Sequence, residues 1–180
     1  MVTVLGERGM LGSVVARRWR ELGDTDHVVN CIRPDDLAVS RAFRGIIQPS
    51  TDAIAEDTEY AATKRELEAI EGAVTIRSGI VDITRQPTVA YVNWLCNPLT
   101  PLEWADLAYE MRDTPGVHIA GRRLYSRYGV ALAVAHVFDR PEPEFAVAAT
   151  DNDRLQQPDD RVRPSLWNAL IAYRDWLEHP

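Results

Sequence analysis

The sequence contains little lysine, little cysteine and no long apolar run. Of its 180 residues 20 are basic, and all of these except Lys64 are arginine. The two cysteines, Cys31 and Cys96, lie 65 positions apart without a histidine or further cysteine at ligand spacing, which excludes the usual zinc patterns and a disulfide scaffold. The longest apolar run, 130–137, is too short to cross a bilayer, and residues 2–5 lack the features of an export signal. We therefore expect a reduced, cytoplasmic protein with no metal site.

Acidic groups outnumber basic ones. The formal net charge is −7 and the isoelectric point is near 5.1. Binding of a phosphate backbone needs a basic face, and no run of arginines here is longer than two. We expect no nucleic-acid partner and no membrane partner, and a small molecule as the substrate.

Strand-like and helix-like segments alternate along the first half of the chain, a pattern typical of a parallel α/β sheet. The expected strands are 2–5, 27–32, 45–48 and 74–81, and the expected helices are 10–22, 35–44 and 58–70. The second half is mostly helical, with helices that begin at residues 101, 126 and 164 and one short strand at 117–120.

Glycines mark the junction between the first expected strand and the first expected helix. Residues 6–12 read Gly-Glu-Arg-Gly-Met-Leu-Gly, which is the spacing G-x-x-G-x-x-G. Such glycines allow a tight turn, close approach of the backbone to a pyrophosphate and packing of helix on strand, while the helix N-terminus supplies N–H donors. A glycine turn without any ligand would give the same pattern, and Arg8 could contact a phosphate or only water.

Tyr60 and Lys64 lie four residues apart in the expected helix 58–70 and therefore share one face. A buried ammonium beside a phenol favours the phenolate, which lets the tyrosine exchange a proton with a carbonyl or alcohol oxygen. Thr51, or Ser50 if the strand register shifts by one residue, would hydrogen-bond the same oxygen. The single lysine suits this role because a guanidinium cannot replace a compact ammonium there.

Together these motifs resemble the extended short-chain dehydrogenases/reductases, and most of all their dTDP-4-dehydrorhamnose reductase branch. The similar segments follow in order along nearly the whole chain: the glycine motif, Ser-Thr-Asp at 50–52, Tyr60-x-x-x-Lys64, the strand 75–81, and a Gly-Val-His-Ile-Ala-Gly segment at 116–121 that precedes Ser-Arg-Tyr at 126–128. The resemblance implies a Rossmann-type doubly wound sheet.

The resemblance also implies roles for individual residues. Thr51, Tyr60 and Lys64 would be catalytic, with Lys64 also binding the nicotinamide ribose. The residues expected at the cofactor are Gly6, Arg8, Gly9, Met10, Leu11, Gly12, Asn30 and Cys31. On the substrate side we expect Ser50 and the adjacent guanidiniums of Arg122 and Arg123, which could hold a sugar-nucleotide diphosphate by bidentate contacts.

The chain is shorter than the resemblance requires. Only 38 residues separate Gly12 from Thr51, which leaves room for about two strands and one short helix beyond the first helix. One or two strand–helix units are missing, including the region that usually holds adenine. We therefore expect a shortened Rossmann core over residues 1–96 and a small, mostly helical substrate-binding lobe over 97–180, packed as one compact unit.

Residues 27–36 allow two interpretations. If they hold the second strand of the sheet, Arg33, Asp35 and Asp36 compete for the position that contacts the ribose 2′ group and selects NAD or NADP. If they hold instead the strand that precedes the catalytic one, the second strand is deleted and the choice of NAD or NADP cannot be read. We favour the second interpretation.

The leading hypothesis for function is an NAD(P)-dependent reductase that transfers hydride to a carbonyl, with the 4-keto group of a deoxysugar nucleotide as the substrate that the resemblance suggests. The alternative is a trimmed, non-catalytic nucleotide-binding or regulatory module on the same frame. Because relatives commonly dimerise through the helix that carries the Tyr and Lys, we expect a homodimer, and a second copy could also supply the missing strands.

Overall fold

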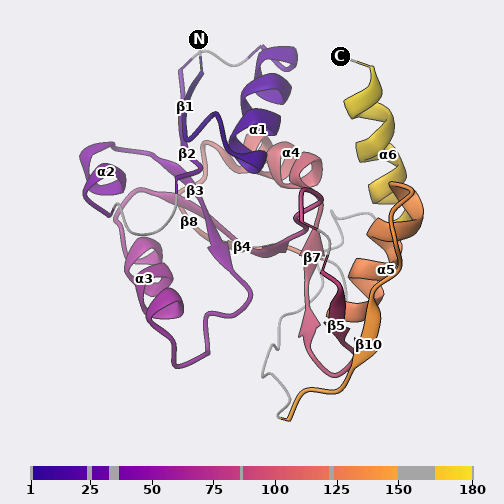
Figure 1. Ribbon diagram of the computed structural model, residues 1–180. Helices are drawn as coiled ribbons and strands as arrows, with labels where there is room; N and C mark the ends of the chain where they lie inside the picture. The colour runs from indigo at the N-terminus through magenta and orange to yellow at the C-terminus, as the bar shows by residue number, and fades with distance from the viewer. Residues whose placement is uncertain are drawn as a thin grey trace.

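A six-stranded sheet forms the centre of the molecule (Figure 1). The structure, a computed structural model, describes residues 2–23, 26–32, 37–85, 87–121, 124–149 and 165–179. The strand order is β1-β2-β3-β4, and the far edge of β4 is shared by β8 and β7. All pairs in this sheet are parallel. The strands are β1 (Thr3–Leu5), β2 (Val28–Asn30), β3 (Ile47–Thr51), β4 (Val74–Ile80), β7 (Pro98–Leu99) and β8 (Gly116–Ile119).

Helices cover both sides of this sheet. On one side α1 packs against α4, and on the other α2 lies beside α3 (Figure 1). Two more helices, α5 and α6, pack against each other beyond β7. The bounds are α1 (Met10–Glu21), α2 (Leu37–Ala42), α3 (Glu59–Glu68), α4 (Pro101–Met111), α5 (Arg127–Val137) and α6 (Leu166–Glu178). In the described part of the chain, no helix is long and apolar enough to cross a membrane.

Two small ribbons lie beside the main sheet. In one, β5 (Val89–Tyr91) pairs in parallel with β10 (Glu144–Ala146). In the other, β6 (Leu95–Cys96) pairs antiparallel with β9 (Tyr125–Ser126). Both ribbons join segments distant in sequence, and they bring the C-terminal half against the carboxyl end of the sheet.

Capping residues in the sequence set where several helices begin. The Thr100 side chain accepts a hydrogen bond from the N–H of Glu103, and the Glu103 side chain reaches back to the Thr100 N–H, so the two form a capping box in front of Pro101. Thr58 caps α3 by accepting from the Ala61 N–H at 3.1 Å. The predicted helix start at residue 101 is therefore confirmed, and the helix predicted over 58–70 is present as α3.

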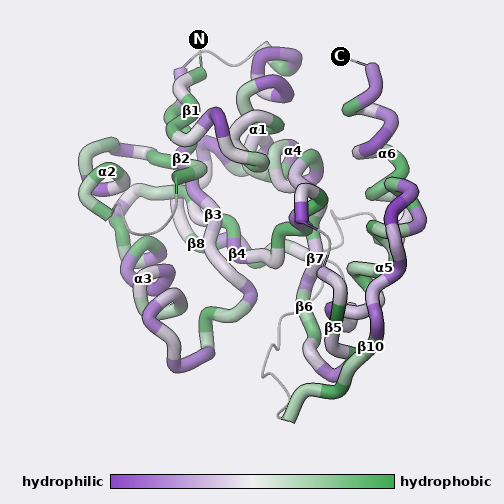
Figure 2. The backbone as a smooth tube through the Cα atoms, in the orientation of Figure 1, coloured by the Kyte–Doolittle hydropathy of each residue, from purple (hydrophilic) through white to green (hydrophobic). Residues whose placement is uncertain are grey.

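Large aromatic and aliphatic side chains fill the core. Trp19 and Trp104 are fully buried between α1 and α4, and Tyr173 and Leu170 bring α6 into the same cluster. The indole N–H of Trp19 donates to the Ala105 carbonyl at 2.9 Å, which satisfies its one polar atom. In Figure 2 polar residues mark the outer turns of α1 and α6.

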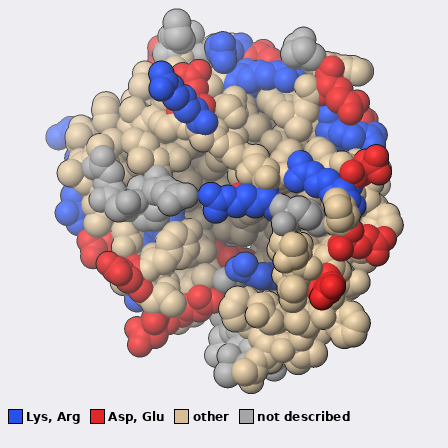
Figure 3. All heavy atoms as spheres, in the orientation of Figure 1, with Lys and Arg blue, Asp and Glu red and all other residues tan. Residues whose placement is uncertain are grey.

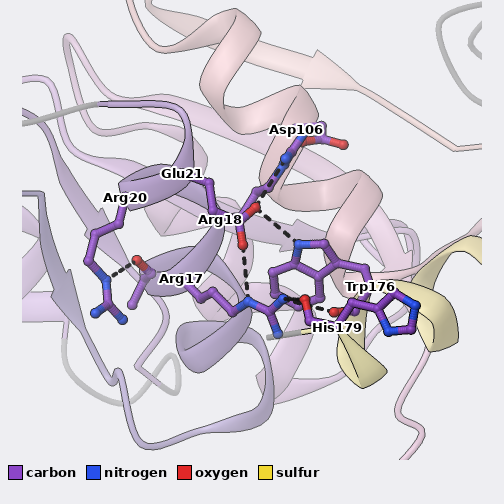
Figure 4. Close-up of polar contacts among 8 residues, drawn as sticks. Arg17, Arg18, Arg20, Glu21, Asp106, Trp176 and His179 are labelled. Atoms are coloured by element: carbon purple, nitrogen blue, oxygen red, sulfur yellow. Dashed lines mark hydrogen bonds and ion pairs between the residues drawn. The ribbon is translucent and has the colours of Figure 1, made fainter.

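The last helix is tied to the first (Figure 4). The Arg17 guanidinium lies 3.8 Å from the centroid of the Trp176 ring and donates to the carbonyls of Trp176 and His179 at 2.8 and 2.7 Å. The Trp176 indole N–H donates to Glu21 at 3.0 Å, and Arg18 donates to Asp106 on α4 at 2.6 Å. These contacts close α6 and α4 over one face of α1.

The position of β2 decides between the two interpretations of residues 27–36. In the doubly wound order 3-2-1-4-5-6, the first strand lies beside the fourth. Here β2 lies beside β1, where either the second or the fourth strand would lie. Successive right-handed crossovers to the second and third strands would place α1, α2 and α3 on one face of the sheet, but α1 lies on the face opposite α2 and α3 (Figure 1), so β2 occupies the place of the fourth strand. Only six residues connect α1 to β2, too few for another strand and helix. The favoured interpretation is confirmed, and Arg33, Asp35 and Asp36 lie outside the described residues.

The strand prediction is wrong in three places. Beyond residue 81 it named one strand, at 117–120, whereas the described residues there also form β5, β6, β7, β9 and β10. The third strand, expected at 45–48, spans Ile47–Thr51 and so contains both Ser50 and Thr51. The strand expected at 117–120 was assigned to the C-terminal lobe, but as β8 it pairs with β4 in the main sheet. The boundary predicted after residue 96 stays a prediction. Elements on both sides of it contribute to the same sheet, because β7 and β8 pair with β4 and α4 packs against β4 and β7.

Candidate active site

The glycine loop joins β1 to α1 through close backbone contacts. The Gly9 N–H donates to the Gly6 carbonyl at 2.9 Å, and Gly6 has a left-handed φ of +81°. A Cβ added at Gly12 would lie 2.1 Å from the Gly6 oxygen, so only glycine fits there. A Cβ at Gly6 would lie 3.0 Å from the backbone of Cys31, so this loop approaches the end of β2 closely.

The first turn of α1 is open for an anion. No side chain caps this helix at Gly9, and its first turn carries no acidic residue. The first-turn N–H groups of a helix, here those of Met10 and Leu11, have no partner within the helix and attract a negative charge. Arg8 lies exposed in the same loop. The loop thus offers N–H donors and a guanidinium to the predicted pyrophosphate, whose binding here stays a prediction.

Lys64 is buried at the end of the sheet. Only 4 % of the residue is exposed, and its Nζ donates to the Pro49 carbonyl at 2.9 Å. Burial lowers the pKa of Lys64 to about 8, against the opposing effects of Cys31 and Glu68. The Nζ atom lies 5.6 Å from the centroid of the Tyr60 ring, one helical turn earlier on α3.

Tyr60 and Thr51 line the same cavity as Lys64. The Tyr60 side chain is half exposed, whereas Thr51 at the end of β3 is 6 % exposed. Thr51 Oγ1 accepts a hydrogen bond from the Ala53 N–H at 3.1 Å, and a hydroxyl that accepts a bond keeps its own hydrogen to donate. The three predicted catalytic residues thus come from two elements and share one cavity.

The cavity measures about 630 Å³, a size typical of small-molecule sites. One wall comes from β3, α3 and β4, and the other from the C-terminal half, with Tyr91, Trp94, Arg127 and Val134. Arg127 stands over the Trp94 ring at 5.6 Å. Figure 3 shows charges of both signs on the face seen in Figure 1, with acidic side chains gathered over α3.

Ser50 lies on the cavity wall, but its hydroxyl is engaged elsewhere. It donates to Glu68 Oε1 at 2.6 Å, and Arg77 donates to both oxygens of the same carboxylate at 2.9 and 2.5 Å. Glu68 stands one turn after Lys64 on α3, so this network fixes α3 against β3 and β4. Of the two hydroxyls that the sequence offered, Thr51 is the one whose hydrogen is not used in this network.

The end of β2 connects the glycine loop to the lysine. The Cys31 N–H donates to the Leu5 carbonyl at 2.8 Å, its backbone lies under Gly6, and its thiol interacts electrostatically with Lys64. Burial raises the pKa of the Cys31 thiol to about 12. The Asn30 amide donates to Ser40 at 2.6 Å, which ties β2 to α2. Asn30 and Cys31 thus bring together motifs that lie fifty residues apart in the sequence.

Sequence reasoning missed two residues at this site. Ser78 on β4 is the register partner of Thr51, lines the cavity and is 2 % exposed. Within the described residues its hydroxyl has no hydrogen-bond partner. Asp52 accepts from the Asn97 N–H at 3.0 Å, and Gly79 leaves room for its carboxylate. Alternation along β4 was the only available signal for Ser78. The predicted Arg122 and Arg123 lie outside the described residues.

No family model and no curated protein matches the sequence. Solved structures do match, over nearly the full length. A dTDP-4-dehydrorhamnose reductase from Clostridium acetobutylicum superposes with a TM-score of 0.65 at 14 % identity, covering 98 % of this chain and 99 % of that one. The chain has the fold of the extended short-chain dehydrogenases/reductases.

Two further structures support the same fold. The dTDP-glucose 4,6-dehydratase from Bacillus anthracis, in complex with NAD, gives a TM-score of 0.67 at 11 % identity, covering 99 % of this chain and 96 % of that one. The GDP-mannoheptose C4 reductase from Campylobacter jejuni, with NADP bound, gives 0.65 at 9 % identity, covering 98 % of each chain. The resemblance seen in the sequence is thereby confirmed for the fold, in a form shortened to 180 residues.

Proposed function

We propose that this protein is a short-chain reductase that uses a nicotinamide cofactor to reduce a carbonyl group on a small molecule. The observation that supports this function is the arrangement of Thr51, Tyr60 and Lys64 around one cavity of about 630 Å³, with the lysine ammonium buried 5.6 Å from the tyrosine ring centroid. Among substrates, we propose the 4-keto group of a deoxysugar nucleotide, since a dTDP-4-dehydrorhamnose reductase shares the fold.

The residues present fit the diphosphate and the nicotinamide ribose of such a cofactor. The glycine loop packs so closely on α1 that only glycine fits at Gly12, and the first turn of that helix, at Met10 and Leu11, is uncapped and offers N–H donors to a diphosphate. An ammonium has three donors, and Lys64 directs one of them to Pro49, which leaves donors for ribose hydroxyls. When bound, the nicotinamide supplies the hydride for the carbonyl carbon.

The protein side chains then handle the substrate oxygen. Tyr60 donates its phenolic proton to the oxygen as negative charge develops there, and the nearby ammonium of Lys64 stabilises the resulting phenolate. Thr51 donates a hydrogen bond to the same oxygen and holds it in place. Lys64 and Thr51 act from buried positions at the end of the sheet, where water screens their interactions less.

The C-terminal wall of the cavity is suited to a nucleotide sugar. The ring centroids of Tyr91 and Trp94 lie 5.1 Å apart with the ring planes tilted by 44°, and Arg127 lies over Trp94. Aromatic faces suit sugar and base rings, and a guanidinium suits a diphosphate. We propose that these three residues bind the substrate, in addition to Arg122 and Arg123, which the sequence predicted.

The first experiment measures the binding of NADH and NADPH to the purified protein by calorimetry. Saturable binding of either cofactor supports the reductase. If neither binds at millimolar concentration, the non-catalytic module that the shortened sheet also suggests takes its place. Size-exclusion chromatography with light scattering then checks the homodimer, which stays a prediction.

A further inference from the structure

We infer that this chain recognises the nicotinamide mononucleotide half of the cofactor and that its described residues form no subsite for the adenosine half. The inference rests on the proposed function, and it specifies which part of the cofactor the protein holds. It predicts that reduced nicotinamide mononucleotide, NADH and NADPH bind with nearly the same affinity.

The strand order of the main sheet supports this inference. In a doubly wound sheet a dinucleotide lies across the crevice beside the first strand, with one mononucleotide-binding half of the sheet on each side. In this chain β2, β3 and β4 build the side that carries Lys64 and Thr51. Within the described ranges nothing pairs with the other edge of β1, and the six residues between α1 and β2 cannot form a strand–helix unit.

The chain therefore retains contacts to one nucleoside and lacks those to the other. The acidic side chain that holds the adenosine ribose, or the arginine that accommodates a 2′-phosphate, stands at the end of the second strand, about 20 residues after the glycines. That strand is deleted here, and with it the position of such a side chain. No described strand lies beside β1 on that side, so the adenosine would extend past the edge of the sheet into water.

The contacts to the other half are continuous. Gly6 rests on the backbone of Cys31, Cys31 lies close enough to Lys64 to affect its pKa, and Lys64 shares the cavity with Tyr60. A phosphate at the first turn of α1 and a ribose at Lys64 are thus served by adjoining residues. This continuity is what a mononucleotide needs, and it ends at β1.

The test compares ligands on the unchanged protein, so it does not depend on a variant that folds. Isothermal titration calorimetry is run with reduced nicotinamide mononucleotide, NADH, NADPH and AMP. We expect the first three dissociation constants to agree within about threefold, and AMP to give no saturable heat. NADH or NADPH binding more than tenfold tighter than the mononucleotide would overturn the inference, as would AMP that competes with NADH.

The outcomes separate this inference from the proposed function. Tight binding of NADH together with weak binding of the mononucleotide would leave the reductase standing and overturn the half-site. Absence of binding by all three nicotinamide ligands would overturn both. As a further readout, Lys64→Met should weaken the three nicotinamide ligands by one common factor of at least tenfold, with Arg65→Lys on the exposed face of α3 as the matched control. Different factors for NADH and the mononucleotide would contradict a shared site.

Discussion

The two sides of β1 differ in what they retain. On the β2 side the sheet continues to β4, and it carries the buried lysine, the cavity and the bonded network of Ser50, Glu68 and Arg77. On the opposite side the described chain has no strand, and α1 runs almost directly into β2. Under the proposed function, the side that is present carries the residues for the chemistry, and the side without a described strand is the one that would hold the far end of a dinucleotide.

The largest effect is expected for Lys64→Arg. This change keeps the positive charge, but a planar guanidinium does not fit a site that is 4 % exposed and bonded to the Pro49 carbonyl. We expect carbonyl reduction to fall by at least about 100-fold, within the range that a positioned acid–base group contributes. Steady-state turnover measures it, with Arg65→Lys as the reciprocal exchange that should leave turnover unchanged. Wild-type turnover in Lys64→Arg would remove the role assigned to Lys64.

Next in size is Gly12→Ala, which tests the glycine loop. The new Cβ would lie 2.1 Å from the Gly6 oxygen, so loop and helix must move apart, at a cost of about 1–3 kcal/mol in unfolding free energy. Cofactor affinity should fall as well. Gly9→Ala is the matched control, because its Cβ would lie 3.3 Å from the same oxygen and needs only a small shift. Equal losses in the two variants, measured by urea denaturation, would argue against this geometry.

The buried lysine should also show in the pH dependence of stability. Its pKa in the folded protein, about 8, lies below the ordinary value, so between about pH 8 and 10.5 the unfolded chain binds a proton that the folded chain does not. The unfolding free energy should therefore rise with pH over this window, by on the order of 3 kcal/mol from this group.

Ionisation of Cys31 has the opposite effect on the pH dependence of the unfolding free energy. Its pKa is raised from 9.0 to about 12, so above pH 9 the unfolded chain loses a proton that the folded chain keeps, and stability falls. Urea titrations of the wild type and Lys64→Met at several pH values separate the two effects. The wild type should gain stability relative to Lys64→Met from pH 8 upward. A constant difference would show that Lys64 is not buried as an ammonium.

The smallest effect is expected for Ser78→Ala. Its hydroxyl is buried and has no hydrogen-bond partner among the described residues, so its removal should change stability by less than about 0.5 kcal/mol or raise it slightly. If the hydroxyl meets the substrate beside Thr51, turnover should fall by about tenfold while cofactor binding stays the same. Thermal unfolding and kinetics on the same preparation check both parts. A loss of stability without a loss of turnover would make Ser78 a structural residue.

Local patterns in the sequence predicted one part of the site. The rest depends on pairing between segments that are distant in sequence, which has no local pattern. The glycine motif and the Tyr60–Lys64 spacing were readable because each lies within a single element. The extent of β3 was not, because Pro49 argues against a central strand. It is tolerated since β2 pairs with β3 only at Ile47, and beyond that point β3 bonds to β4 alone.

The C-terminal wall could not be predicted from local patterns. Tyr91 meets the cavity through β5, whose partner β10 lies 55 positions further along the chain. Arg127 reaches it because its N–H donates to the Trp94 carbonyl at 2.7 Å. Neither contact has a periodic signature in the sequence, whereas the buried face of α4 and its capping box do.

We propose that the part of the sheet from β1 to β4, with α3, supports carbonyl reduction in which Tyr60 donates the proton. The most direct test of this proposal follows the loss of NADH absorbance on addition of a 4-keto-deoxysugar nucleotide, for the wild type and Tyr60→Phe, with NADH affinity measured on both. We expect turnover by the wild type, a loss of at least about 100-fold in Tyr60→Phe, and NADH affinities within about threefold, because Tyr60 is half exposed and little of its packing changes. Equal turnover in both proteins, or NADH binding without any turnover by the wild type, would contradict the account.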